Sequence, residues 1–302
     1  MFNKKIKRKI TTVNIIGGLG NQMFQYAFGY SVSKNNNTAL KLDTGGFNDY
    51  HLRGYGLDIY GIKINANLRS KHNFFINKLN TKNKTLLEMV IYKFFKELLK
   101  VSKFFYPEKK DFVFDKDVFN IKKDTYFYGY WQNEKYFKKY RNDILKIFTL
   151  KNLHTQTQAY QKQISDSSSV SLHIRRGDYV TDKHTNSIMG ICNIDYYKKA
   201  VFLFQNAHFF IFSDDLDWAK NNLDFIENKT FVELDKDIPV HESMYLMSQC
   251  EHNIIANSSF SWWGAWLNQS DNKTVVAPKK WFTDKKLQEQ SRDVYCENWV
   301  KI

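Results

Sequence analysis

The sequence has few cysteines for its 302 residues, and their spacing is informative. Cys192, Cys250 and Cys296 are odd in number and far apart. This pattern excludes a disulfide framework and gives no zinc-binding motif, so we expect a reducing compartment. The chain also has only three prolines and shows no internal repeat.

Long apolar runs are missing as well. The first ten residues are basic, but no apolar run long enough to cross a membrane follows them. We therefore expect neither a signal peptide nor a membrane anchor, and we predict a cytoplasmic location. Peripheral contact with the inner face of the membrane stays open as an alternative.

The net charge of +14 and the pI of about 9.4 favour an anionic partner. Nucleic acid, a membrane surface and a phosphorylated substrate all fit that description, and so does a Lys-rich solvated surface with no partner. No nucleic-acid-binding motif accompanies the charge, so we expect no nucleic acid partner. The aromatic content of 17% fits stacking on sugars, although aromatic residues more often form plain core.

The chain length fits two domains of about 150 residues each. Its first part predicts a strand, a glycine turn, a helix and a second strand, a unit typical of a parallel sheet. A polar stretch at 156–169 is interpreted as an interdomain linker. We predict an α/β fold with two Rossmann-like domains, 1–165 and 166–302. The predicted strands are 11–16, 38–42, 126–130, 170–174, 209–212, 254–256 and 274–277, and the predicted helices are 21–34, 133–148, 215–223 and 261–267.

The segment 69–110 is Lys-rich, with apolar residues at helical spacing. Such a segment can cover the core, lie on a membrane surface or hold an acceptor. Core packing is the default interpretation.

The most informative motif is the stretch from His173 to Tyr179, which leaves the end of a predicted strand. Ligands of open α/β sheets bind beyond the carboxyl ends of strands. Arg175 and Arg176 can grip a diphosphate there through charge-assisted hydrogen bonds. Asp178 can orient one arginine or accept a proton. The alternative is a surface ion pair of small energetic value.

A glycine-rich turn at 17–20 opens the first helix and resembles a dinucleotide-binding fingerprint, with Asp43 at the end of the next strand. Met23 occupies the position of the third glycine, which argues against a nicotinamide cofactor. Asn21 and Gln22 at the helix start can instead donate to a sugar or a phosphate.

Two further motifs follow predicted strands. Asp215 and Asp217 match a metal-binding Asp-x-Asp signature, but helical geometry separates them by about 200°, and a helix cap is the alternative. The segment 257–266 begins with serines that can present hydroxyl and N–H groups to an anion. A plain serine cap on a buried helix explains that segment equally well.

Four blocks together resemble the α-1,2-fucosyltransferases of glycosyltransferase family 11: 17–27, 173–179, 212–215 and 256–267. The first, second and fourth are specific, and the third is generic. The residues from about 45 to 125 contain no recognised motif, and acceptor choice would reside there. The resemblance implies a GT-B-like fold, with the C-terminal half binding GDP-fucose and the N-terminal half on the acceptor side.

The resemblance also implies roles for single residues. Arg175 would act on the donor diphosphate with Arg176 beside it, and Asp178 is the candidate general base. The other implied substrate-binding residues are His173 and Asp214 at the guanosine, Ser258, Ser259 and Phe260 at the phosphates, and Asn21 and Gln22 from the other domain.

The implied reaction is an inverting transfer of L-fucose from GDP-β-L-fucose to the 2-hydroxyl of a terminal galactose, with no metal and no cofactor. The expected acceptor is a galactose-terminated oligosaccharide or a lipid-linked glycan. The alternatives are a fucosyltransferase of other linkage or acceptor, and a non-catalytic protein that binds a nucleotide or polyanion.

Overall fold

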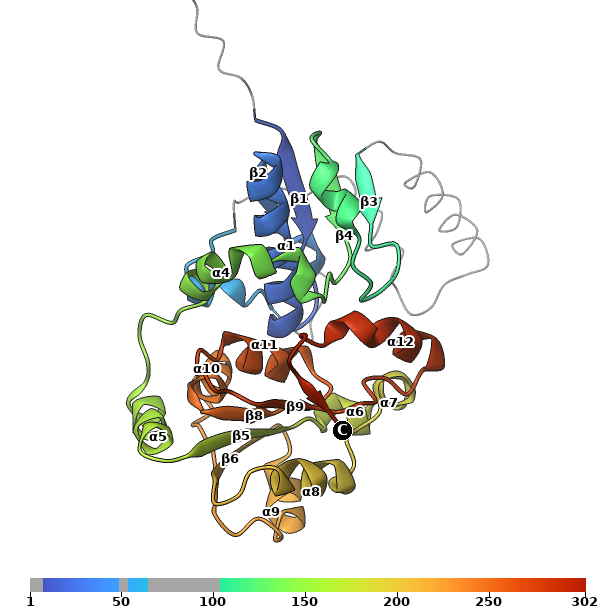
Figure 1. Cartoon of the computed structure of the whole chain (residues 1–302). Helices are drawn as coiled ribbons and strands as arrows, with labels where there is room; N and C mark the ends of the chain where they lie inside the picture. The colour runs from blue at the N-terminus through green and yellow to red at the C-terminus, as the bar shows by residue number, and fades with distance from the viewer. Residues whose placement is uncertain (1–7, 49–53, 65–103) are drawn as a thin grey trace, which may run out of the picture. The chain divides into compact units, whose positions relative to one another are not determined.

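The computed structural model describes residues 8–48, 54–64 and 104–302 (Figure 1). The chain divides into two compact units, Met1–Phe148 and Thr149–Ile302, called unit 1 and unit 2 here. Each unit is built on a parallel sheet, so the predicted α/β class with two Rossmann-like domains is confirmed.

Unit 1 contains a four-stranded parallel sheet in the order β2-β1-β4-β3. The helix α1 connects β1 to β2, as the sequence predicts for a strand-helix-strand unit. The strands are β1 (Ile10–Asn14), β2 (Ala39–Asp43), β3 (Phe105–Pro107) and β4 (Thr125–Tyr128).

Helix α1 (Leu19–Asn36) packs closely on this sheet because Gly29 has no side chain. A Cβ atom at Gly29 would lie 2.7 Å from Cγ2 of Val13 and 2.8 Å from Cδ1 of Leu40. The helix ends where Asn37 adopts a left-handed conformation with φ of 51°, a conformation that asparagine tolerates better than most residues.

Aromatic side chains form much of the core of unit 1. The rings of Phe28 and Trp131 stack with centroids 4.0 Å apart, and Phe127 and Tyr136 meet them edge-on. All four side chains are buried. Their role here is packing, in line with the more common interpretation of a high aromatic content.

The predicted helix 133–148 is wrong as a single element. The chain instead forms η4 (Glu134–Tyr136), η5 (Lys138–Tyr140) and α4 (Arg141–Ile147). Phe137 interrupts the helical backbone with φ of −132° and is fully buried, so the side chains that fill the core fix a bend that helical spacing does not reveal. The other short helices of unit 1 are η1 (Gly45–Asn48), η2 (Leu57–Tyr60) and η3 (Lys116–Asn120).

Unit 2 contains a six-stranded parallel sheet in the order β10-β9-β8-β5-β6-β7. The central strand β5 is buried along its whole length. The strands are β5 (Ser169–Ile174), β6 (His208–Ser213), β7 (Lys229–Phe231), β8 (His252–Ile254), β9 (Val275–Ala277) and β10 (Val300–Lys301).

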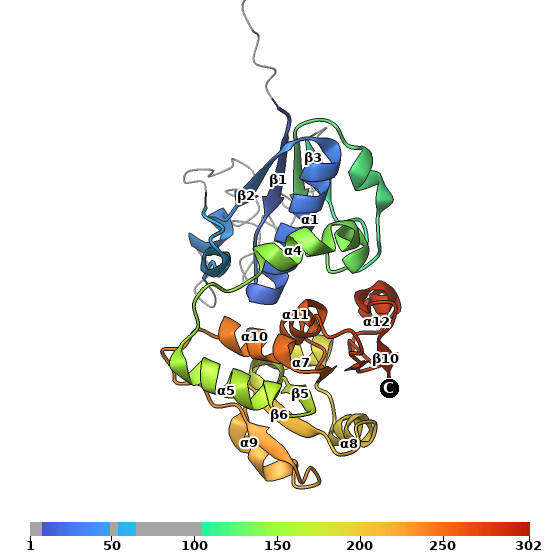
Figure 2. The same ribbon diagram turned by 60° about the vertical axis from the view of Figure 1, so that its left-hand side comes forward.

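Helices cover both faces of this sheet (Figures 1 and 2). Alternate residues of β6 point to opposite faces: Ile211 packs with α8 and α9, and Phe210 and Phe212 pack with α5 and α10. The helices of unit 2 are α5 (Thr155–Ser165), α6 (Gly177–Thr181), α7 (Lys183–Met189), α8 (Ile194–Phe202), α9 (Leu216–Asn222), α10 (His241–Gln249), α11 (Ser259–Leu267), α12 (Lys285–Gln290) and η6 (Ser291–Val294).

The prediction of a linker at 156–169 is wrong. Most of these residues form α5, and the division between the units lies at 148/149 rather than at 165/166. Only Thr157 and Ile164 of this helix are buried, so its apolar pattern is too sparse to distinguish it from a polar loop.

Most of the Lys-rich segment 69–110 lies outside the described residues, and the interpretations of it stay predictions. Among the described residues, no helix has both the length and the hydropathy needed to span a bilayer.

Candidate functional site

The residues singled out in unit 2 gather at the carboxyl ends of three neighbouring strands, β8, β5 and β6. Arg175 and Arg176 follow β5, Asp214 follows β6, and Ser258 lies four residues after β8. The carboxyl ends of parallel strands meet at one edge of the sheet, which is where open α/β sheets bind ligands.

Two carboxylates from different segments fix Arg175. Its Nη1 lies 2.7 Å from Oδ2 of Asp214, and its Nη2 donates to Oδ1 of Asp178. The guanidinium also lies 5.3 Å from the ring centroid of Tyr179. Only 18% of the Arg175 side chain is exposed, so this is no loose surface ion pair.

Arg176 is fixed in a parallel way. Its Nε donates to Oδ2 of Asp215 at 2.9 Å, and its guanidinium lies 4.2 Å from the ring centroid of Trp218. Its backbone N–H donates to Oδ1 of Asp214 at 2.8 Å. Asp214 therefore holds the backbone of Arg176 and the side chain of Arg175 at the same time.

Gly177 makes this arrangement sterically possible. A Cβ atom at Gly177 would lie 2.5 Å from Oδ2 of Asp214, the oxygen that receives Nη1 of Arg175. The absence of a side chain at Gly177 thus gives a carboxylate room to approach.

His173 is buried beneath this edge. Burial, together with the charge of Arg175, lowers its pKa to about 3, so the imidazole is neutral at physiological pH. Among the described residues, its Nδ1 is buried without a hydrogen-bond partner, and its ring centroid lies 5.9 Å from that of Phe260. An unsatisfied buried nitrogen is costly unless a ligand or a water completes it.

The start of α11 completes the edge. Ser258 is the N-cap, and its Oγ accepts the N–H of Phe260 at 3.3 Å. The helix is buried through its tryptophans, Trp262, Trp263 and Trp266. The structure therefore contains the serine cap on a buried helix that was the alternative interpretation of this segment. A capped helix start can still favour an anion through its dipole, so the two interpretations do not exclude each other.

The two acids of the metal-binding signature, Asp215 and Asp217, belong to the start of helix α9. Asp215 is the N-cap of α9, where its Oδ1 accepts the N–H of Trp218, and its other oxygen binds Arg176. Asp217 lies in the first turn of the helix. Within the described parts of the chain, no group of three His, Cys, Asp or Glu side chains is arranged to hold a metal ion.

Asn21 and Gln22 belong to unit 1. Oδ1 of Asn21 accepts from Nε2 of Gln132 at 2.7 Å. Gln22 is buried, and its Nε2 donates to the carbonyls of Gly17 and Gly54. Both amide hydrogens of Gln22 are therefore used inside unit 1, and we correct its assignment from substrate contact to a support of the glycine turn.

A carboxyl group that sequence reasoning missed lies at the carboxyl end of β3. Oε2 of Glu108 accepts the N–H groups of Tyr130 and Trp131 at 2.8 and 3.1 Å. Burial raises the pKa of Glu108 to about 7, although those N–H groups act in the opposite direction. Its sequence context shows nothing unusual, because the partners are 22 and 23 residues away.

Glu108 should make the stability of the chain depend on pH. Its folded pKa of about 7 lies above its ordinary value of 4.5, so stabilisation present below pH 4.5 is lost as pH rises through 7. As pH rises from 4.5 to 8, the free energy of unfolding of Glu108→Gln should increase by up to about 3 kcal/mol relative to that of wild type. Urea unfolding at both pH values measures this gain. Exposed Asp58→Asn is the control, and parallel pH curves for wild type and Glu108→Gln would contradict the assignment.

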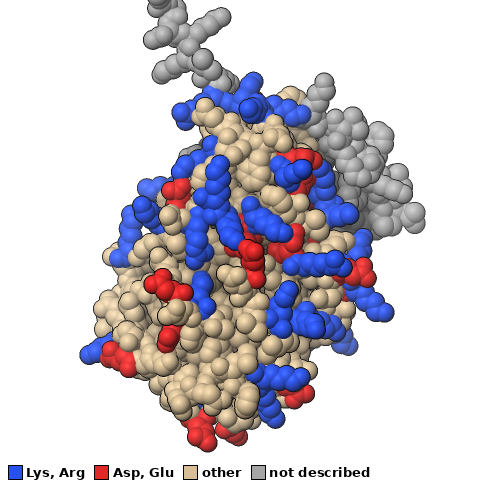
Figure 3. All heavy atoms as spheres, in the orientation of Figure 1, with Lys and Arg blue, Asp and Glu red and all other residues tan. Residues whose placement is uncertain are grey.

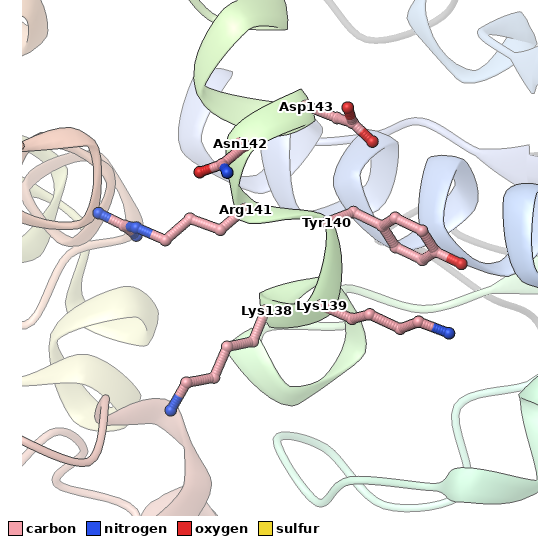
Figure 4. A pocket seen from close by; sticks show the side chains of 6 residues that line it. All are labelled: Lys138, Lys139, Tyr140, Arg141, Asn142 and Asp143. Carbon is pink, nitrogen blue, oxygen red and sulfur yellow. The ribbon is translucent and has the colours of Figure 1, made fainter.

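A surface pocket of about 280 Å³ in unit 1 is formed by Lys138, Lys139, Tyr140, Arg141, Asn142 and Asp143. Figure 4 shows that Lys138 and Arg141 point to one side of the segment, whereas Lys139 and Tyr140 point to the other. Because its cations do not converge, we assign no ligand to this pocket.

Sequence reasoning also missed the supports of the two arginines. The sequence predicts a metal ligand or a helix cap at Asp215, but it indicates neither the contact of Asp215 with Arg176 nor the contact of Trp218 with the same arginine. The spacing of Asp215 and Trp218, three residues apart across a helix start, matches a cap and its first turn and is a usable signal.

Comparison with known proteins defines the family. The model of Glycosyl transferase family 11 matches residues 2–302. An α-1,2-colitosyltransferase of Escherichia coli is 37% identical, over 97% of this chain and 99% of its own length. The O-antigen biosynthesis glycosyltransferase WbnK of Escherichia coli is 33% identical, over 95% of this chain and 98% of its own. The chain therefore belongs to glycosyltransferase family 11, as the four sequence blocks indicated.

More distant similarities exist. Human galactoside α-(1,2)-fucosyltransferase 1 is 26% identical over 45% of this chain and 41% of its own. Among solved structures, a mutant of Arabidopsis thaliana FUT1 in complex with GDP has a TM-score of 0.49 and 12% identity, covering 89% of this chain and 70% of its own. The α-1,6-fucosyltransferase NodZ has a TM-score of 0.44 and 15% identity, covering 86% and 93%. The family assignment does not depend on these similarities.

Proposed function

We propose that this glycosyltransferase moves L-fucose from GDP-β-L-fucose to the 2-hydroxyl of a terminal galactose in a glycan, with inversion to an α-1,2 linkage. Membership of family 11 supports a fucosyl-type transfer and disfavours the non-catalytic alternative. The names of two relatives, a colitosyltransferase and a galactoside fucosyltransferase, both specify an α-1,2 linkage.

The observation on which the proposed donor site rests is the pair of arginines that carboxylates fix at the carboxyl end of β5. When GDP leaves, negative charge builds on its diphosphate, and cations already held in place stabilise that charge without reorganisation. We place the diphosphate at Arg175 and Arg176, the guanosine near His173 and Asp214, and the phosphate cap at Ser258, Ser259 and Phe260.

The chemistry is a single displacement. The acceptor hydroxyl oxygen bonds to the anomeric carbon of fucose, and the bond from that carbon to the GDP oxygen breaks with its electron pair on the diphosphate. The hydroxyl proton passes to a base or to water. Because the arginines supply the neutralisation, we propose that the reaction needs neither a metal ion nor a cofactor.

Asp178 stays the candidate base, but its contact with Nη2 of Arg175 favours an orienting role. We therefore expect Asp178→Asn to weaken donor binding and to lower kcat/KM about tenfold, because Arg175 loses one charged partner. Initial rates at varied GDP-fucose measure both effects. Asp195→Asn, an exposed acid on α8, should change neither value. A hundredfold fall in kcat at unchanged donor affinity would assign Asp178 as the base instead.

A second donor is favoured by one observation. The relative with 37% identity over nearly the whole chain is named a colitosyltransferase, and colitose differs from fucose by the absence of the 3-hydroxyl. We keep GDP-colitose as the alternative donor for the same site, because the guanosine and diphosphate contacts would be shared.

Product analysis tests the proposal directly. We expect GDP-fucose and a panel of galactosides to give an α-1,2-fucosylated product, in the presence of EDTA, and calorimetry to show tighter binding of GDP than of UDP. GDP-colitose in the same assay decides between the two donors. Tighter binding of UDP, or transfer only after addition of Mg²⁺ or Mn²⁺, would overturn the donor or the metal-free site, respectively.

The acceptor is proposed more broadly, as a galactose-terminated oligosaccharide or a lipid-linked glycan. A cytoplasmic location with peripheral contact at the inner face of the membrane would suit the second of these. Unit 1 is the proposed acceptor side, and Asn21 is its remaining candidate contact from the sequence analysis.

A further inference from the structure

The positive charge of this chain is confined to one unit. Unit 1 contains 28 Lys and Arg against 12 Asp and Glu, a net charge of +16, whereas unit 2 contains 17 against 19, a net charge of −2. The proposed donor site lies in unit 2. A need to bind an anionic nucleotide therefore does not explain the basic character of the chain.

Part of this charge lies at the amino edge of the unit 1 sheet. Arg8 and Lys9 precede β1, and Lys122 and Lys123 precede β4, the strand beside it. All four side chains are exposed, and Figure 3 shows Lys and Arg side chains gathered around the start of the described chain. Within the described residues, none of the four forms an ion pair.

Hydrogen bonds hold these segments in register. The N–H of Ile10 donates to Oδ1 of Asp124 at 2.9 Å, and the N–H of Ala39 donates to the carbonyl of Lys9 at 2.8 Å. Asp124 is the acid nearest in sequence to Lys122 and Lys123, and its Oδ1 already accepts the N–H of Ile10 at the start of β1. The cations are therefore placed together by the sheet itself, with little compensation of their mutual repulsion.

An exposed aromatic ring belongs to the same edge. Phe104 directly precedes β3 and is 58% exposed, and its carbonyl accepts the N–H of Tyr126 at 2.6 Å. Cations beside an exposed aromatic ring match the surface of an anionic bilayer, where headgroups attract the charges and the interface accepts the ring. A polyanion with neither an apolar layer nor stacking bases, such as polyphosphate, would gain nothing from the ring.

We propose that the amino edge of the unit 1 sheet, formed by Arg8, Lys9, Phe104, Lys122 and Lys123, docks on an anionic phospholipid surface. The remaining candidate contact of this unit, Asn21, follows the opposite, carboxyl edge, which is roughly 15 Å away along the five residues of β1. Docking leaves that carboxyl edge uncovered. The inference is independent of which sugar the enzyme transfers.

Vesicle sedimentation of the full chain tests this surface. The variant Arg8→Gln/Lys9→Gln/Lys122→Gln/Lys123→Gln is compared with Lys199→Gln/Lys236→Gln/Lys285→Gln/Lys286→Gln, which removes the same charge from exposed positions of unit 2. Each surface cation contributes roughly fivefold to binding, so the first variant should bind vesicles with 30% phosphatidylglycerol at least twentyfold more weakly. The unit 2 variant should bind within about threefold of wild type.

Two further measurements separate a membrane from other polyanions. Phe104→Ala should weaken vesicle binding several-fold and leave binding to polyphosphate unchanged, because polyphosphate has no base to stack on the ring, and Phe104→Trp should restore vesicle binding. Equal losses in the two four-site variants, equal binding to neutral phosphatidylcholine vesicles, or oligonucleotide binding without vesicle binding would overturn the proposal. Unchanged GDP-fucose hydrolysis and thermal unfolding of the amino-edge variant confirm that it is folded.

Discussion

Arg175→Ala should reduce transfer at least a hundredfold while the protein stays folded. Arg175 supplies a fixed cation where charge is expected to build on the leaving diphosphate, and loss of such a contact costs about 3 kcal/mol in the transition state. Steady-state rates with GDP-fucose and a galactoside measure the loss. Thermal unfolding should change little, because the two carboxylates that lose their partner, Asp178 and Asp214, both reach solvent.

Two comparisons sharpen this test. Arg175→Lys keeps the charge but cannot span Asp178 and Asp214 at once, so it should recover only part of the activity. Arg292→Ala removes an exposed arginine from η6 of the same unit and should be neutral. Near wild-type turnover in folded Arg175→Ala would remove Arg175 from the catalytic centre and, with it, the proposed place of the diphosphate.

The sequence was sufficient to predict the buried strands and the edge of the sheet where candidate residues collect. The strand β5 is buried at every residue, and its alternation of Val170, Leu172 and Ile174 with polar residues has the period of two that identifies a strand. The helix α5 was not predicted, because most of its side chains face solvent and leave no apolar pattern to detect. The interruption of the predicted helix 133–148 at Phe137 was not predicted either, because tertiary packing determines it.

Pairing between side chains was the part that sequence reasoning could not supply. Consecutive acids, Asp214 and Asp215, bind consecutive arginines that lie 39 residues before them in the chain, and only the parallel register of β5 and β6 sets which acid meets which arginine. In the same way, the burial of Gln22 depends on Gly54, which is far from it in sequence. The sequence therefore identifies the motif residues but not the contacts that each of them makes.

Asp214 offers the clearest case in which geometry and resemblance predict different results. The resemblance places Asp214 at the guanosine, whereas the structure shows it binding the Arg175 side chain and the Arg176 N–H. Asp214→Asn keeps an oxygen for the Arg176 N–H but presents an NH₂ group to Nη1 of Arg175, where two donors repel. We expect kcat/KM to fall at least thirtyfold, a transition-state loss of about 2 kcal/mol.

Inosine diphosphate distinguishes the two roles because it lacks the 2-amino group of guanine. If Asp214 accepts hydrogen bonds from the guanine edge, wild type should bind GDP more tightly than IDP, and Asp214→Asn should lose that preference. If Asp214 positions Arg175, as its contacts favour, calorimetry should show the same GDP-to-IDP ratio in wild type and variant, with both nucleotides bound more weakly. Asp217→Asn, an exposed acid three residues along the chain, should match wild type in rate and in nucleotide preference. An unchanged rate in Asp214→Asn would show that the contact between Asp214 and Arg175 is dispensable. The diphosphate would then have to be stabilised by Arg176 and the start of α11.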